Sequence, residues 1–168
     1  MVKTSPKPQF PPKNYLNREL SLLAFNRRVL AQAQDERLPL LERLRFLCIV
    51  SSNLDEFFEI RMAGIKEQIR AHSNTVSVDG KTPQETYRLV SAQAHRLVEE
   101  QYQTLNDVIL PQLAQNGIRF LRRATWTPAQ RTWIYEYFFF EFMSILTPIG
   151  LDTSHPFPKV LNKSLNFA

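Results

Sequence analysis

The stretch Leu44–Gln68 constrains the fold more than any other part of the chain, because apolar residues recur in it at helical spacing. Its second half carries one apolar stripe, formed by Leu54, Phe58, Met62, Ile65 and Ile69. The polar run Ser51-Ser52-Asn53 separates this stripe from an apolar run before it. Glu56 follows Asn53 at capping-box spacing, at which the two residues satisfy the free amides of a helix start. The pattern predicts that one helix ends at the polar run and that Asn53 caps the next.

Two more helices are predicted before this stretch. Asn17 is suited to cap a helix from Arg18 to about Gln34, which is apolar on more than one side. Pro39 fits the first position of the helix that ends at the polar run. The helix capped by Asn53 would then continue to about Arg70.

A long helix is predicted after a polar loop. Thr82-Pro83-Gln84-Glu85 combines a capping threonine, a proline at the first position and a glutamate at the third. An apolar face follows for several turns, with an interruption at Pro111 and an end at Asn116-Gly117. We therefore expect residues 17–117 to form an all-α domain, an antiparallel helical bundle.

The character of the chain changes after Gly117. Residues 118–121 have the composition of a strand, Thr127-Pro128 begins an aromatic-rich helix, and residues 161–168 again suggest a strand. Since these strands have no visible partners, we expect residues 118–168 to be the incomplete, truncated start of an α/β domain. Residues 1–16 are predicted to form a mobile, proline-rich arm.

Composition narrows the function classes. With 4 glycines the chain contains neither a GxGxxG nor a GxxxxGK[ST] phosphate-binding motif. A formal charge of +5, with the excess concentrated before Ser52, leaves open a non-enzymatic helical module that binds RNA or a protein partner. Against RNA, the arginines are dispersed and no aromatics interleave with them, so no specific nucleic acid is expected. The single cysteine, Cys48, is interpreted as a buried thiol.

No signal peptide is visible, and no apolar run approaches the length that spans a membrane. The expected compartment is the cytoplasm.

No group of residues in the sequence supports catalysis. The three histidines, His72, His95 and His155, lack the spacing of a metal motif. Ser51 and Ser52 have no adjacent base. The acidic residues Asp55, Glu56 and Glu59 are better explained as partners of a helix dipole than as metal ligands.

Asn53 is the one candidate ligand-binding residue. A carboxamide carries both a donor and an acceptor and can pair with the edge of an adenine, although a capping asparagine needs no ligand to explain it. The neighbouring Asp55 and Glu56 would repel phosphates. A base is therefore the part of a nucleotide that this position would accept.

Several segments resemble the bacterial polyphosphate kinases that make long-chain polyphosphate. The dense part of the resemblance is Asn17-Arg18-Glu19-Leu20-Ser21, Ala24-Phe25-Asn26, Arg28-Val29-Leu30, Leu40-Leu41-Glu42-Arg43-Leu44, the run Ser51-Ser52-Asn53-Leu54-Asp55-Glu56-Phe57-Phe58, and Arg61 with Ala63-Gly64. Leu146-Thr147-Pro148, Asp152, His155-Pro156-Phe157-Pro158 and Ser164-Leu165-Asn166 are similar to the start of that family's head domain.

The resemblance implies the N-terminal and early head region of a kinase that reversibly transfers the terminal phosphate of ATP to polyphosphate, with Mg²⁺ and a phosphohistidine intermediate. It assigns to Asn53 a contact with the adenine of ATP. The catalytic histidine, the phosphate-binding arginines and the Mg²⁺ ligands of the family belong to downstream catalytic domains, so no catalytic or metal residue is expected here and this region alone should be inactive. The expected partners are ATP, ADP, polyphosphate and those downstream domains. We also expect a homo-oligomer at full length and leave peripheral membrane association open.

Overall fold

The computed structural model describes residues 10–154, 156–160 and 164–166. Most of the predicted arm, residues 1–9, and much of the predicted final strand therefore lie outside the described residues. The chain divides into two units, Met1–Phe120 and Leu121–Ala168. Each is described here by itself.

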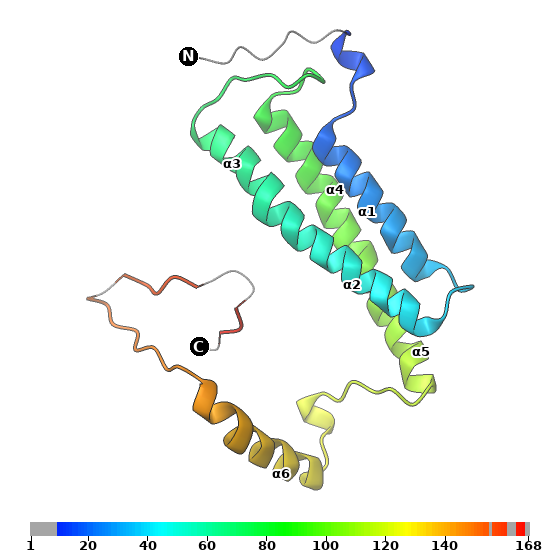
Figure 1. The fold of residues 1–168 in the computed structure, drawn as a ribbon, viewed down its shortest axis with the longest axis vertical. Helices are drawn as coiled ribbons and strands as arrows, with labels where there is room; N and C mark the ends of the chain where they lie inside the picture. Colours follow the sequence, from blue (N-terminus) through cyan, green and yellow to red (C-terminus); the bar gives the residue numbers. More distant parts are fainter. Residues whose placement is uncertain (1–9, 155, 161–163, 167–168) are drawn as a thin grey trace. The chain divides into compact units, whose positions relative to one another are not determined.

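The first unit is a bundle of three helical rods, in which successive rods run in opposite directions (Figure 1). The first rod is α1, Arg18–Gln34. The second joins α2, Leu40–Glu56, through the π-helical segment η2, Phe57–Met62, to α3, Ala63–Arg70. The third joins α4, Pro83–Gln103, through the π-helical segment η3, Thr104–Ile109, to α5, Leu110–Gln115. The predicted antiparallel helical bundle is confirmed.

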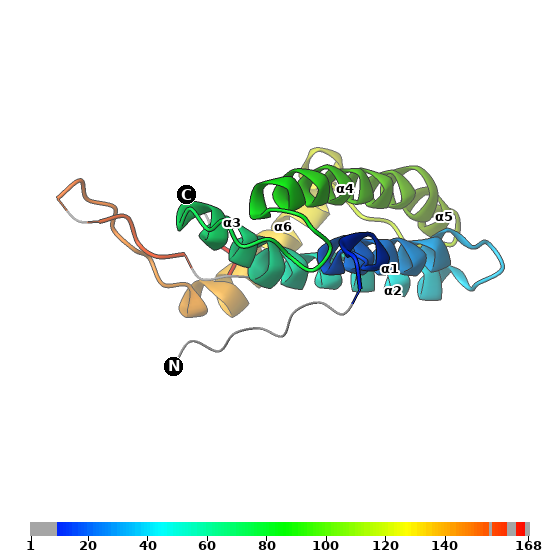
Figure 2. The same ribbon diagram turned by 90° about the horizontal axis from the view of Figure 1, so that it is seen from above.

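The core of the bundle lies where the three rods meet. α1 contacts both α2 and α4, and α3 contacts α4. Figure 2 shows α4 lying over α1 and α2 when the molecule is seen from above. Burying a large apolar side chain fully is worth about 1.5–3 kcal/mol, so this core makes a large favourable contribution to the stability of the unit. Its members are Leu23, Leu30, Ala33, Leu47, Val50, Leu54, Phe57, Met62, Val90, Ala94 and Leu97.

The predicted break at Ser51–Asn53 is absent, and the prediction that Asn53 caps a helix is wrong. α2 continues through this run to Glu56, and the Asn53 carbonyl accepts a hydrogen bond from the Phe57 N–H inside the helix. The buried residues Val50 and Leu54 lie on either side of the polar run, whereas Ser51 and Ser52 face solvent. Because burial is continuous along one face, it outweighs the local capping chemistry.

The π-helical segment η2 explains why the predicted apolar stripe is partly wrong. The buried positions are Leu54, Phe57, Met62 and Ile65, whereas Phe58 is 39% exposed. The step of five residues from Phe57 to Met62 is the spacing of a π turn, which shifts the buried face by one position.

Three other sequence-based expectations have clear outcomes. Pro39 is the N-cap residue of α2 and not its first residue. The Cys48 thiol, expected to be buried, is exposed, because it lies on the side of α2 that no other rod covers. The long helix does end just before Asn116-Gly117, and the φ of 83° at Gly117 allows Ile118 to donate its N–H to the Leu113 carbonyl at 2.9 Å.

The predicted caps at Asn17 and Thr82 are confirmed. The Asn17 Oδ1 accepts from the Leu20 N–H at 3.0 Å, and Thr82 forms a complete capping box with Glu85. The Asn17 Nδ2 also donates to Asp79 at 3.1 Å, which ties the loop before α4 to the start of α1.

Asp79 is a buried carboxylate that this loop holds in its charged form. It accepts hydrogen bonds from Ser77, from the Lys81 ammonium at 2.8 Å and from Asn17. Burial by itself raises the pKa of Asp79, but these three hydrogen bonds outweigh it and lower the pKa to about 2.

The second unit begins with a short 3₁₀ turn, Arg123–Thr125, and contains α6, Pro128–Tyr137, which continues through the π-helical segment η5, Phe138–Phe142, to the 3₁₀ turn Met143–Ile145. The predicted cap of α6 is confirmed, since Thr127 and Gln130 form a capping box. The residues that the structure describes contain no strand, and Ile118–Leu121 is irregular. A strand needs a neighbouring strand to pair its backbone groups, and the described residues offer none.

None of the helices formed by the described residues is both long and apolar enough to cross a membrane.

Candidate functional site

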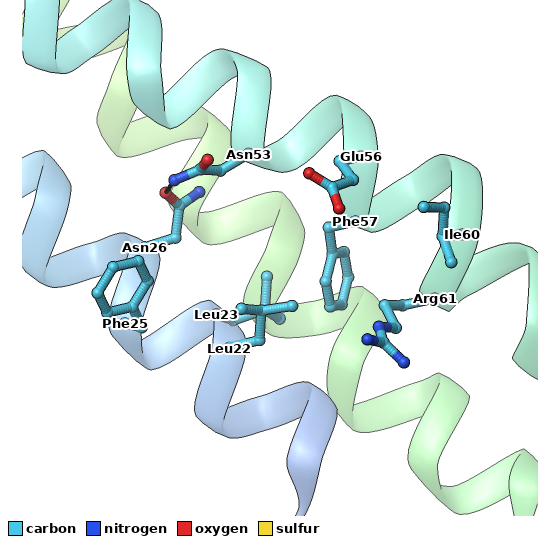
Figure 3. A pocket seen from close by; sticks show the side chains of 9 residues that line it. All are labelled: Leu22, Leu23, Phe25, Asn26, Asn53, Glu56, Phe57, Ile60 and Arg61. Carbon is cyan, nitrogen blue, oxygen red and sulfur yellow. Dashed lines mark hydrogen bonds between the residues drawn. The ribbon is translucent and has the colours of Figure 1, made fainter.

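The candidate site is a pocket of ≈ 230 Å³ between α1 and the junction of α2 with η2 (Figure 3). One wall comes from the middle of α1, and the other from the last turns of α2 and the first turns of η2. The lining residues are Leu22, Leu23, Phe25, Asn26, Asn53, Glu56, Phe57, Ile60 and Arg61.

Two carboxamides meet in this pocket. The Asn53 Nδ2 donates to the Asn26 Oδ1 at 3.1 Å, and the Asn26 Nδ2 donates to the Val50 carbonyl at 3.2 Å. Asn26 is 3% exposed, whereas Asn53 is only partly buried. Figure 3 shows the two carboxamides facing each other, with the nitrogen of Asn53 next to the oxygen of Asn26.

Apolar side chains form the floor of the pocket. Leu23 and Phe57 are 3% and 2% exposed, so their positions are set by the core of the bundle. Phe25, on the α1 side, is 48% exposed and carries the Arg28 guanidinium 5.6 Å above its ring. A flat, apolar ring system fits such a lining better than a hydrated, charged group does.

Two charged side chains, Glu56 and Arg61, lie at the η2 end of the pocket (Figure 3). Neither forms an ion pair with another residue in the described part of the chain. They carry opposite charges, so the pocket as a whole has no excess of cations that would hold a triphosphate.

The structure shows that Asn53 is not a helix cap, but its side chain still lines an open pocket. The argument that Asp55 and Glu56 complement the dipole of a helix start is wrong, because no helix starts there. The carboxamide of Asn53 nevertheless lines an open pocket, and the carboxylate of Glu56 lines the same pocket. The adenine contact assigned to Asn53 stays a prediction.

Asn26 is a site residue that the sequence reasoning missed. In α1 the buried positions are Leu23, Asn26, Leu30 and Ala33, so a polar residue occupies the apolar face of the helix. That placement was a usable signal, because a buried carboxamide requires a hydrogen-bonding partner.

The other candidate residues are not brought together. Ser51, Ser52, Asp55 and Glu59 are exposed on the surface of the second rod. His95 is exposed, its Nδ1 lies 2.7 Å from the Ser91 carbonyl, and His155 lies outside the described residues. Among the residues that the structure describes, no three His, Cys, Asp or Glu side chains are grouped so that they could hold a metal ion.

Comparison with known proteins places this bundle in a family. Residues 15–121 match the model of the polyphosphate kinase N-terminal domain, and residues 129–168 match the model of the polyphosphate kinase middle domain. The chain belongs to the polyphosphate kinase family. The matched N-terminal domain includes the whole three-rod bundle and its pocket.

Relatives in this family are similar over most of the chain. The polyphosphate kinase of Neisseria meningitidis serogroup A is 61% identical over 153 residues, which are 91% of this chain and 22% of that protein. The polyphosphate kinase of Burkholderia vietnamiensis is 59% identical over 152 residues, 90% of this chain and 22% of that protein. The chain therefore spans about a fifth of the length of these relatives.

A solved structure is similar in fold. The crystal structure of polyphosphate kinase from Porphyromonas gingivalis matches with a TM-score of 0.65 and 30% sequence identity, over 82% of this chain and 19% of that one. The helical architecture of the first unit is thus shared with a polyphosphate kinase.

Proposed function

We propose that this chain is the N-terminal region of an enzyme that reversibly transfers the terminal phosphate of ATP to polyphosphate, and that its pocket holds the adenine of ATP. The observation that carries the second part is the partly exposed carboxamide of Asn53 beside an apolar floor. A carboxamide can donate to and accept from the edge of an adenine, and apolar side chains can cover its faces.

The size and charge of the pocket favour a base over a whole nucleotide. Its volume of ≈ 230 Å³ is below the roughly 300–1,000 Å³ of pockets that enclose a drug-sized ligand. Glu56 repels phosphate, and only one guanidinium, that of Arg61, lines the pocket. The phosphates of ATP would therefore lie outside this pocket.

Phosphoryl transfer itself is assigned to domains downstream of this chain. That reaction depends on placing the reacting phosphate in line and stabilising its charge, so a remote base contact contributes by positioning. The phosphohistidine and the Mg²⁺ ligands belong to those domains. We propose that the full-length protein is a cytoplasmic homo-oligomer that uses ATP, ADP and polyphosphate. Any association with membranes would be peripheral.

The alternative of a basic RNA-binding module receives little support from the surface charges. A nucleic-acid groove needs cations that are free to meet phosphates. Arg43 is buried, and four further arginines pair with carboxylates: Arg27 with Glu100, Arg37 with Asp35, Arg45 with Glu42, and Arg70 with Glu67.

The test is Asn53→Ala in the full-length enzyme. Loss of a hydrogen-bonding carboxamide should raise the KM for ATP about tenfold, because roughly 1.4 kcal/mol of binding is lost, and should change kcat much less. Steady-state kinetics with ATP and polyphosphate measure both constants. Ser52→Ala, a neighbouring substitution on the exposed face of α2, is the matched control and should leave both unchanged.

An unaltered ATP dependence in Asn53→Ala would remove the base contact from the proposal. Turnover by residues 1–168 alone would contradict the assignment of phosphoryl transfer to the downstream domains.

A further inference from the structure

We infer that Asn26 fixes the orientation of the Asn53 carboxamide, so that the pocket presents an acceptor oxygen and selects a purine with an amino group at position 6. This inference rests on the proposed adenine contact and adds a positioning residue to it. It follows from a short chain of hydrogen bonds that begins at a backbone carbonyl.

The chain of hydrogen bonds begins at Val50. A backbone carbonyl oxygen can only accept a hydrogen bond, so the atom of Asn26 that lies 3.2 Å from it must be the Nδ2 donor. The other end of this carboxamide, Oδ1, is thereby turned toward Asn53. The two ends of an isolated carboxamide are hard to tell apart, and this contact with a main-chain oxygen distinguishes them.

The same reasoning then applies to Asn53. Its partner is now an acceptor, the Asn26 Oδ1, so the atom of Asn53 at 3.1 Å must be its Nδ2. Among the residues that the structure describes, none donates a hydrogen bond to the Asn53 Oδ1. Since Asn53 lines the pocket, the groups left for a ligand are this oxygen and the second hydrogen of Nδ2.

These remaining groups match adenine. Its 6-amino group can donate to the Asn53 Oδ1, while a ring nitrogen next to it accepts from Nδ2. A purine with a keto group at position 6 would place two acceptor oxygens against each other in the same pose. A purine with hydrogen at position 6 would leave the oxygen without a donor, which costs binding.

Asn26 is held rigidly enough to impose this orientation. It is 3% exposed and lies on the face of α1 that packs against α2. Rotating the Asn53 carboxamide by half a turn would set its oxygen against the oxygen of Asn26. The orientation is therefore set before a ligand arrives, which lowers the cost of binding.

The test measures kcat/KM of the full-length enzyme for ATP and for purine riboside 5′-triphosphate, which lacks only the 6-amino group. In the unmodified enzyme we expect ATP to be preferred about tenfold, the usual effect of one hydrogen bond. Asn26→Leu removes the partner of Asn53 and should reduce this preference to about threefold or less.

Asn26→Asp is the conservative variant. In its protonated form the carboxyl group donates to the Val50 carbonyl and accepts from the Asn53 Nδ2, so below the pKa of this carboxyl the variant should keep most of the ATP preference that Asn26→Leu loses. Leu30→Ala, one turn further along α1 and in the core, controls for loss of stability alone. It should lower the unfolding midpoint and leave the ratio of the two kcat/KM values unchanged.

The outcomes separate this inference from the proposed function. If Asn53→Ala leaves the ATP dependence unchanged, the base contact and the inference fall together. If Asn53→Ala abolishes the preference but Asn26→Leu keeps it, the base contact stands and the role of Asn26 is overturned. Loss of the preference in Leu30→Ala would also overturn that role, because any weakening of the bundle would then have the same effect.

Discussion

The two π-helical segments of the bundle differ in what surrounds them. Next to η2, Phe57–Met62, lies the pocket lined by Asn53. The Oδ1 of Asn53 accepts no hydrogen bond from any residue that the structure describes. Next to η3, Thr104–Ile109, lies a hollow of ≈ 270 Å³ lined by three carboxylates and by polar groups that bond to one another. A π turn often marks a functional site. Of η2 and η3, only η2 lies beside a surface suited to a base. The side chains around a π-helical segment, and not the segment itself, therefore determine whether it can bind a ligand.

The polar contacts around η3 hold the rods together. The Gln34 Nε2 donates to the Thr104 Oγ1 at 3.0 Å, and this hydroxyl donates to the Glu100 carbonyl at 2.8 Å. The buried Arg43 donates to the Ala33 carbonyl at 2.9 Å and to the Gln112 Oε1 at 2.8 Å. Substitutions here should therefore affect stability, and substitutions beside η2 should affect nucleotide use.

The largest expected effect concerns the continuity of the rod that contains η2. Ser52→Pro should destabilise the bundle by about 3 kcal/mol or more, because a proline inside a helix removes one hydrogen bond and clashes with the preceding turn. Urea unfolding followed by circular dichroism measures this, with Ser52→Ala as the control. A cost below about 1 kcal/mol would indicate that the chain breaks at this run, as local sequence rules predict.

The next effect concerns the η3 side. Arg43→Ala should lower the free energy of unfolding by about 2–3 kcal/mol, since it removes two hydrogen bonds from a charged donor. Arg45→Ala is the matched control, because Arg45 is exposed and its ion pair with Glu42 is 3.7 Å long. That control should cost less than about 0.5 kcal/mol. A tenfold change in the KM for ATP in a folded Arg43→Ala enzyme would remove the distinction between the two segments.

The smallest expected effect concerns the Thr104 hydroxyl in η3. Thr104→Val keeps the shape of the side chain but removes the hydroxyl that links Gln34 to Glu100, and should cost about 1 kcal/mol of stability. The KM for ATP of the full-length enzyme should stay the same, in contrast to Asn53→Ala. Thermal unfolding and steady-state kinetics on one preparation give both numbers, and a raised KM without lost stability would contradict the prediction.

Local chemistry in the sequence predicted those features that depend on a few neighbouring residues. The caps at Asn17, Thr82 and Thr127 form as expected because each is completed within three residues. The capping pattern at Asn53 failed because its neighbours Val50 and Leu54 bury against other rods, which the pattern does not report.

The site was predictable only in part for the same reason. Asn53 belongs to a recognisable run, so its candidacy came from sequence. Its partner Asn26 lies 27 positions earlier, on a different helix, and the bond between them depends on the packing of α1 against α2. The shift of the buried face at η2 likewise depends on tertiary packing.

The chain of hydrogen bonds from Val50 through Asn26 to Asn53 begins at a backbone atom, and this has a consequence for how the region tolerates substitution. The oxygen that orients both asparagines belongs to the main chain, and every amino acid supplies it. Replacing the valine would alter how the helices pack but would leave the donor and acceptor directions of these hydrogen bonds unchanged. If the proposed adenine contact holds, the hydrogen bonds that distinguish one nucleobase from another come from two side chains, and the apolar wall around them could vary without changing which base is preferred.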